Sequence, residues 1–290
     1  QIQDNSEIQE IIEKSGLFYK DDNNNIGFKQ QAFVEFLASL EIYHHSRDTH
    51  YIKLVKRFND VIWQNTAIFY AGHSKELSGM IDDIIANSPN EDIKDWFINS
   101  GGMGYLSQAL YLTKPSERKK LVLKSLDNLI KAYEGMKSLS EDENSFIYNM
   151  PIPFIMSIIN YWFNENFKSI TLTKTLEDSF DELFTLENNF ESNFKLLMIS
   201  TSLMSSYIGL DEKFEKLLYR KEFIENPVLP LVANFVLDIG NSHKKNVSDE
   251  AKDRIKKSII KKRDFIKSVL KEPAYRFNDD FTKQEKKSID

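Results

Sequence analysis

Apolar residues recur every three or four positions along most of this chain, and this spacing constrains the fold more than any other feature. In residues 31–43, for example, Phe33, Phe36, Leu37, Leu40 and Tyr43 fall on one face of a helix. Ten glycines and seven prolines among 290 residues are too few for the many turns of an all-β protein. The sequence therefore predicts an all-α fold.

The predicted helices are 10 to 20 residues long and are separated by short breaks. Pro115 can begin a long helix, Ser248 can cap the last one, and Ser140 with Glu143 forms a possible capping box. The glycine-rich segment 100–104 indicates a turn between helices rather than a ligand-binding loop. Because no fixed repeat period is present, we expect an irregular α-solenoid of helical hairpins.

The start of the chain departs from this helical pattern. Residues 17–19 and 26–28 indicate two short strands joined by a turn at 21–25, which is a winged-helix-like β-hairpin. We therefore expect three parts: a winged-helix remnant at 1–48, a linking helical domain at 49–100, and an irregular helical array at 101–290. The array ends in a basic helix, since residues 244–290 carry 15 basic and nine acidic residues in a chain whose net charge is −6.

Composition excludes several classes of function. The chain contains no cysteine, which rules out disulfides, thiolate metal sites and a cysteine nucleophile. The sequence contains no run of about 18 apolar residues, which is the length needed to span a bilayer. Residues 1–10 also lack the basic and apolar segments of a signal peptide. We therefore expect a cytoplasmic protein without a membrane partner.

Two stretches near the N-terminus point to a family. The segments SGLF at 15–18 and IGFKQQAFVEFLA at 26–38 flank the predicted hairpin and resemble the end of the NACHT-type module of STAND-class signal-transduction NTPases. The resemblance covers about the first 75 residues. The residues that match in type and spacing are Gly16, Leu17, Phe28, Phe33, Glu35, Phe36 and Ala38, followed by Trp63 and by Gly72 after Ala71.

This resemblance implies a regulatory role without catalysis. In such proteins an NTPase domain precedes the winged helix, and a C-terminal helical array recognises a trigger, often in bacterial defence against phage. The chain contains no G-x-x-x-x-G-K-[ST] motif, so we expect no enzyme activity and no cofactor here, with ATP or ADP and Mg²⁺ bound by an upstream domain. The implied partners are a protein trigger, the upstream NTPase domain in cis, and further copies of the full-length protein. The start at Gln1 is compatible with a fragment of a longer protein or with a processed chain.

Gln30 is the informative departure from the family pattern. Many members carry a histidine here that contacts the phosphate of the bound nucleotide. An amide can donate a hydrogen bond to phosphate but cannot become cationic, so a lock built on Gln30 would be weaker and insensitive to pH. The alternative is that Gln30 is a capping or solvated residue at the start of a helix.

The basic C-terminal segment supports a second hypothesis. One face of the predicted helix carries Arg254, Lys256, Lys257, Lys261, Lys262 and Arg263. These cations could contact nucleic-acid phosphates, although a solvated surface that pairs with the acidic body is the simpler interpretation. The main alternative to the regulatory region of an NTPase is a stand-alone helical scaffold or regulatory protein–protein interaction module, and nucleic-acid binding ranks after it.

Three further patterns are weaker candidates. His44, His45, His50 and Asp48 could contribute to a metal site but lack a clear fourth ligand, so a solvated turn is favoured and no metal is predicted. Residues 92–94 match half of a nuclease motif, yet charges at a helix start explain them better. The aromatic segment 146–163 could line a groove, but aromatic residues at helical spacing usually fill a core.

Overall fold

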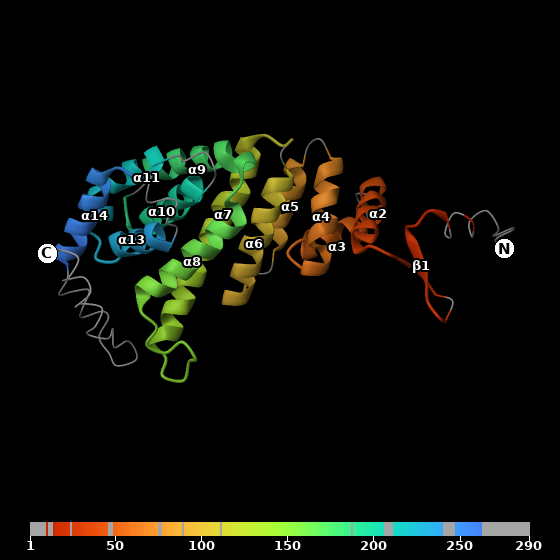
Figure 1. Cartoon of the computed structure of the whole chain (residues 1–290), viewed down its shortest axis with the longest axis horizontal. Coiled ribbons are helices and arrows are strands. Elements are labelled where there is room, and N and C mark those ends of the chain that lie inside the picture. Colours follow the sequence, from red (N-terminus) through yellow and green to blue (C-terminus); the bar gives the residue numbers. More distant parts are fainter. Residues whose placement is uncertain are drawn as a thin grey trace. The chain divides into compact units, whose positions relative to one another are not determined.

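The structure, a computed structural model, describes residues 10, 14–23, 25–45, 49–74, 77–88, 90–110, 112–186, 188–205, 211–239 and 247–262. Within these residues the chain forms 13 α-helices, one short 3-10 helix and one two-stranded antiparallel sheet (Figure 1). The predicted all-α fold with a small N-terminal hairpin is thus confirmed. The chain divides into two compact units, of which unit 1 comprises residues 1–88 and 109–113 and unit 2 comprises residues 89–108 and 114–290. The division at residues 48 and 100 stays a prediction.

Unit 1 contains the hairpin and four helices. They are β1 (Phe18–Lys20), β2 (Ile26–Phe28), α2 (Gln31–His44), α3 (Thr49–Arg57), α4 (Val61–His73) and α5 (Ser78–Asn87). The strands pair with Phe18 opposite Phe28, whose ring centroids are 4.6 Å apart. The carboxylate of Asp21 closes the turn by accepting hydrogen bonds from the backbone N–H groups of Asn23 and Asn25. A hydrogen bond from the Asn25 side chain, followed by these two backbone bonds, lowers the pKa of Asp21.

Helix α2 packs against α4, and the residues that it buries flank its apolar stripe, although Phe36 and Tyr43 of the stripe also contact aromatic rings of α4. The residues buried on α2 are Glu35, Ser39 and Ile42, whereas Phe36, Leu37 and Tyr43 of the predicted stripe are exposed. The core on the α4 side includes the small residues Ala67 and Ala71. Small side chains allow two helices to approach closely, which explains why α2 can bury Ser39 at this contact.

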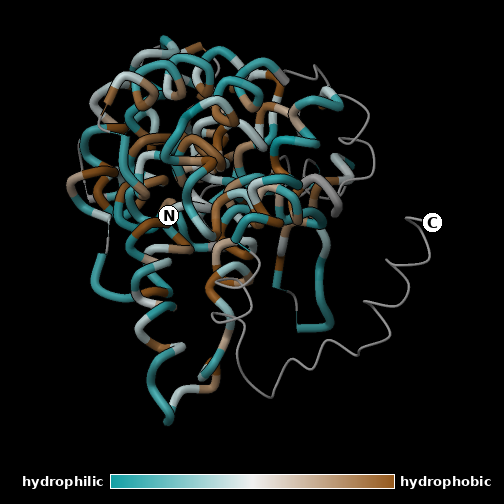
Figure 2. The backbone as a smooth tube through the Cα atoms, turned by 90° about the vertical axis from the view of Figure 1, so that its left-hand side faces the viewer, coloured by the Kyte–Doolittle hydropathy of each residue, from teal (hydrophilic) through white to brown (hydrophobic). Residues whose placement is uncertain are grey.

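Unit 2 contains the remaining helices. They are α6 (Ile93–Ala109), α7 (Pro115–Glu141), α8 (Ile152–Phe167), η1 (Ile170–Leu172), α9 (Thr173–Thr185), α10 (Phe190–Ser205), α11 (Asp211–Leu218), α12 (Lys221–Glu225), α13 (Leu229–Ile239) and α14 (Asp249–Lys261). Every residue of α10 from Ser192 to Met204 is buried, because α7, α8, α9, α11, α12 and α13 all contact it. Around it the helices are amphipathic, and hydrophobic and hydrophilic residues alternate along their turns (Figure 2).

The array is irregular because helices far apart in the sequence also meet. Helix α8 contacts α13 as well as α7 and α10. In a regular solenoid each repeat would contact only its neighbours along the chain. The contact between α8 and α13 therefore agrees with the absence of a fixed repeat period in the sequence.

The glycine-rich segment 100–104 is not the predicted turn but part of α6. Its glycines provide space for α8, since a Cβ atom on Gly104 would lie 2.6 Å from the backbone oxygen of Asn166. At the same contact the indole Nε1 of Trp162 donates a hydrogen bond to the carbonyl oxygen of Phe97, 3.1 Å away. Close helix packing, rather than a reversal of the chain, explains these glycines.

Other predicted helix ends have mixed outcomes. Pro115 begins α7, and the hydroxyl of Ser248 caps α14 by accepting a hydrogen bond from the N–H of Ala251 at 3.2 Å. The capping box at Ser140 is wrong, since α7 continues to Glu141 and the Ser140 hydroxyl donates back to the carbonyl of Lys137. A serine late in a helix commonly makes such a bond, which the sequence pattern alone does not distinguish from a cap.

Candidate functional site: an exposed apolar face on α2

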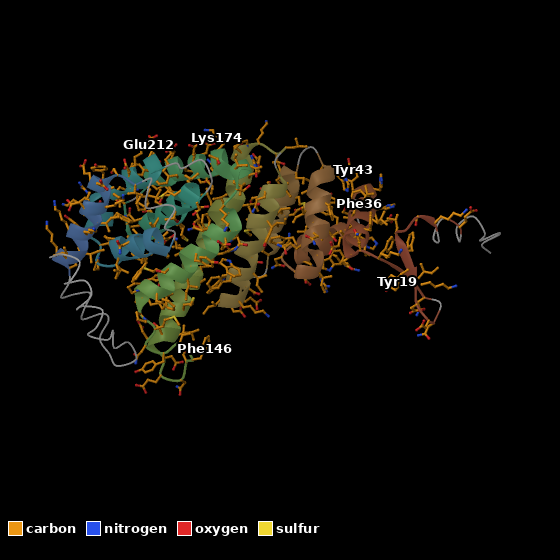
Figure 3. The ribbon with its side chains drawn as sticks, viewed as in Figure 1. Tyr19, Phe36, Tyr43, Phe146, Lys174 and Glu212 are labelled. Carbon is orange, nitrogen blue, oxygen red and sulfur yellow. The ribbon has the colours of Figure 1, made fainter. Side chains whose placement is uncertain are left out.

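Helix α2 exposes four apolar residues, Val34, Phe36, Leu37 and Tyr43. Phe36, Leu37 and Tyr43 lie on one side of the helix, and we call this side the α2 face. Val34 lies opposite Tyr43, because nine residues turn an α-helix by about two and a half turns. Leu37 exposes 46% of its surface and Tyr43 exposes 41%, which is unusual for a helix that buries a glutamate and a serine. Tyr19 and Ile26 of the preceding hairpin are also exposed, and Figure 3 shows Tyr19 apart from Phe36 and Tyr43. Exposed apolar residues that share one side of a helix, as in the α2 face, typically mark an interaction surface.

Aromatic packing against α4 fixes part of this face. The ring of Phe36 lies 5.2 Å from the ring of His73 and 5.7 Å from that of Phe69, and Tyr43 lies 5.9 Å from His73. The Ser39 hydroxyl donates to the backbone oxygen of Phe36, so its own oxygen accepts a hydrogen bond from Nε2 of His73 at 3.1 Å. These contacts hold Phe36 and Tyr43 in place while leaving more than a third of each side chain accessible.

The family-like residues are spread over unit 1 and have different environments. Glu35 is only 7% exposed, and its carboxylate accepts a hydrogen bond from the Asn65 side chain at 3.0 Å, which ties α2 to α4. Gly16 has a φ of +69°, a backbone conformation that favours glycine. Leu17, Phe28, Phe33, Ala38 and Trp63 are half-buried, and Gly72 is exposed with open space around its Cα. Of this set, only Phe36 contributes to the α2 face.

Gln30 occupies the N-cap position of α2. Its backbone is extended and its side chain is exposed, and it makes no capping hydrogen bond. The capping interpretation of Gln30 is therefore wrong. A hydrogen bond from Gln30 to a nucleotide phosphate stays a prediction. The alternative that Gln30 is only a solvated surface residue also stays a prediction.

The basic residues of α14 separate into two groups. Arg254 and Lys262 turn towards the protein: Nε of Arg254 donates to the carbonyl oxygen of Leu218 at 2.9 Å, and Nζ of Lys262 donates to the carbonyl oxygens of Ile224 and Asn226. Burial lowers the pKa of Lys262. The exposed cations of α14 that remain for an outside partner are Lys256, Lys257 and Lys261. Arg263 lies outside the described residues.

The weaker candidates gain little from the structure. Among the described residues, no group of three or more histidine and carboxylate side chains gathers as metal ligands. His44 and His45 are exposed at the end of α2, and Asp48 lies outside the described residues. Asp92 precedes α6 and accepts a hydrogen bond from the N–H of Asp95 at 2.8 Å, as expected for a charge at a helix start.

The aromatic segment 146–163 divides between core and surface. Phe163 is fully buried and stacks on Phe167, with ring centroids 4.5 Å apart. Phe146, Tyr148 and Phe154 are instead exposed. Sequence reasoning missed this exposure, although the three acidic residues at 141–143 could have indicated that the chain reaches solvent here.

Comparison with protein-family models, with curated proteins and with solved structures finds no match to this chain. In the part of the chain that the structure describes, none of the helices combines the length and the apolar character needed to cross a membrane.

Proposed function

We propose that this chain is a non-catalytic regulatory and trigger-sensing region of a NACHT/STAND-type NTPase, acting in bacterial defence signalling in the cytoplasm. Unit 1 would dock on an upstream nucleotide-binding domain in cis, and the helical array of unit 2 would bind a protein trigger. ATP or ADP and Mg²⁺ would belong to the upstream domain.

The observation that carries this proposal is the α2 face. Phe36 of the family-like motif lies on this face, next to Leu37. Helix α2 exposes both apolar residues while it buries the polar residues Glu35 and Ser39. Covering Phe36 and Leu37 would remove apolar surface from water, which is worth about 25 cal/mol per Å². A surface of this kind directly after the winged-helix-like hairpin supports docking against a neighbouring domain.

Trigger binding would act by shifting an equilibrium. For a trigger to release unit 1 from the nucleotide domain, it must bind the undocked form more tightly than the docked form. A coupling of about 1–3 kcal/mol between the two sites would be typical. The buried hydrogen bond between Glu35 and Asn65 would help α2 and α4 to move as one body.

Hydrogen exchange tests the docking. In the longer protein with bound nucleotide, we expect the backbone amides of residues 34–44 to exchange at least about tenfold more slowly than in residues 1–290 alone, because covered helices open less often. Leu37→Ser should reduce this protection. Ile170→Ser, which changes an even more exposed apolar residue of unit 2, should leave it unchanged. Equal exchange of residues 34–44 in both proteins would contradict the proposal.

A further inference from the structure

The turn between α7 and α8 carries the most exposed aromatic side chain in the described part of the chain. Phe146 is 94% exposed, and Tyr148 beside it is 43% exposed. The turn extends beyond the end of α6 (Figure 1), and Phe146 lies in it (Figure 3). We call residues 141–148 the acidic aromatic loop.

Hydrogen bonds give this loop a defined conformation. The N–H of Ser145 donates to the carbonyl oxygen of Asp142 at 2.9 Å, and the N–H of Asn149 donates to the carbonyl oxygen of Ser140 at 2.9 Å. Ile147, between the two exposed aromatic residues, is 5% exposed and anchors the loop on the protein. Phe146 is thus held outward by an ordered backbone, so little conformational entropy would be lost if a partner bound it.

The loop is also strongly acidic. Glu141, Asp142 and Glu143 are all exposed, and within the described residues none of them forms an ion pair. A surface that combines an exposed aromatic residue with three carboxylates is complementary to a partner surface on which an apolar residue is surrounded by basic residues. Such a surface exists on this same chain.

That surface is the outer face of α14. It consists of Lys256, Lys257, Ile260 and Lys261, all exposed, with Ile260 69% exposed among the three lysines. Lys257 pairs with Asp253 at 2.6 Å, whereas Lys256 and Lys261 have no ion pair within the described residues. We call it the α14 face.

We propose that the acidic aromatic loop of one copy of this chain binds the α14 face of a second copy. Phe146 would cover Ile260, and the carboxylates of the loop would pair with the lysines around it. Contact within one chain is disfavoured, because α14 packs on α11, α12 and α13 and the loop lies apart from it in Figure 1.

The two surfaces differ, so each contact is heterologous. Such contacts produce either a closed ring or an open chain of copies. One loop against one helix face is a small interface, and small, charged interfaces give weak association that salt reduces. This inference is independent of the docking of the α2 face.

Sedimentation velocity of residues 1–290 tests the inference. Between about 10 and 500 μM we expect the sedimentation coefficient to rise with concentration in low salt and much less in about 0.5 M NaCl, where the Debye length falls to roughly half its physiological value. Phe146→Ser and Ile260→Ser should each weaken self-association at least about tenfold. Phe154→Ser, which removes an exposed aromatic residue of α8, is the matched control and should associate like the wild type.

A pair of charge reversals makes the test specific. Glu143→Lys and Lys261→Glu should each prevent self-association, while an equimolar mixture of the two variants should form a complex. In the mixture the unchanged loop of the Lys261→Glu chain meets the unchanged α14 face of the Glu143→Lys chain, and the reversed loop fits the reversed helix. Far-UV circular dichroism checks that all variants remain folded. A wild-type chain that stays monomeric throughout would overturn the inference. So would a Phe146→Ser variant that associates normally, or an α14 face that binds a duplex oligonucleotide while the chain stays monomeric.

Discussion

Replacing Gly104 by alanine is expected to destabilise unit 2 by about 2–4 kcal/mol, a large effect for the addition of one methyl group. The new Cβ atom would lie 2.6 Å from the backbone oxygen of Asn166 and 2.9 Å from its Cβ atom. Backbone cannot rotate away as the end of a flexible side chain can, so α6 and α8 would have to separate. Urea unfolding followed by circular dichroism measures the loss.

Two other glycines are the controls for this prediction. A Cβ atom on Gly101, one turn earlier in α6, would approach Asn166 and Trp162 no closer than 3.4 Å, so Gly101→Ala should cost much less. Gly72 in α4 has nothing within 4 Å, and Gly72→Ala should stabilise the protein by up to about 1 kcal/mol through helix propensity. Equal stability of the Gly104→Ala and wild-type proteins would show that α6 and α8 do not approach as described.

Phe194→Ala should have the largest effect of the side-chain truncations considered, about 3–5 kcal/mol. Phe194 lies in the central helix α10, is fully buried, and packs its ring 5.7 Å from that of Tyr133 in α7. Its removal leaves a cavity at the centre of unit 2 that the surrounding helices can fill only in part. The same urea titration measures the change in unfolding free energy.

Phe146→Ala is the matched control, since it makes the same chemical change at a side chain that is 94% exposed. It should change the stability by no more than about 0.5 kcal/mol. If Phe194→Ala were equally mild, α10 could not be the core of unit 2. If Phe146→Ala were strongly destabilising, the acidic aromatic loop would be part of the fold rather than a free surface.

Local patterns in the sequence predicted the class of fold and several helix ends. The three- and four-residue spacing of apolar residues identified the helices, and Pro115 and Ser248 marked the starts of α7 and α14. The hairpin was expected at 17–19 and 26–28, and its first strand begins one residue later, at Phe18. Such signals are local, so they can be recognised before any tertiary contact is known.

The choice of buried face could not be predicted in the same way. In α2 the apolar stripe suggests the core side, but the buried residues are Glu35, Ser39 and Ile42. Phe36 and Tyr43 of the stripe contact α4 only at its edge and stay more than a third exposed. The segment 100–104 posed the same problem, because glycines that form a turn and glycines that admit a neighbouring helix look alike in sequence. Both outcomes depend on which helix lies opposite, and this information is spread over distant parts of the chain.

The candidate surfaces were only partly foreseen. The basic residues near the C-terminus were evident, yet the sequence did not show that Arg254 and Lys262 bind backbone carbonyls while Lys256 and Lys261 remain exposed. The exposure of Phe146 depends on the path of a hydrogen-bonded loop. Composition identifies which residues are charged or aromatic, whereas tertiary contacts decide which of them a partner can reach.

The most direct test of the proposed function is to read the coding sequence upstream of Gln1 in the source of this protein. If the chain is a regulatory region of a NACHT/STAND-type NTPase, the upstream sequence should encode, in the same reading frame, a strand pattern followed by G-x-x-x-x-G-K-[ST]. The backbone N–H groups and the lysine of this motif bind nucleotide phosphates. An initiator methionine immediately upstream, with no such motif in the same reading frame, would contradict the proposal and leave a stand-alone helical binding protein.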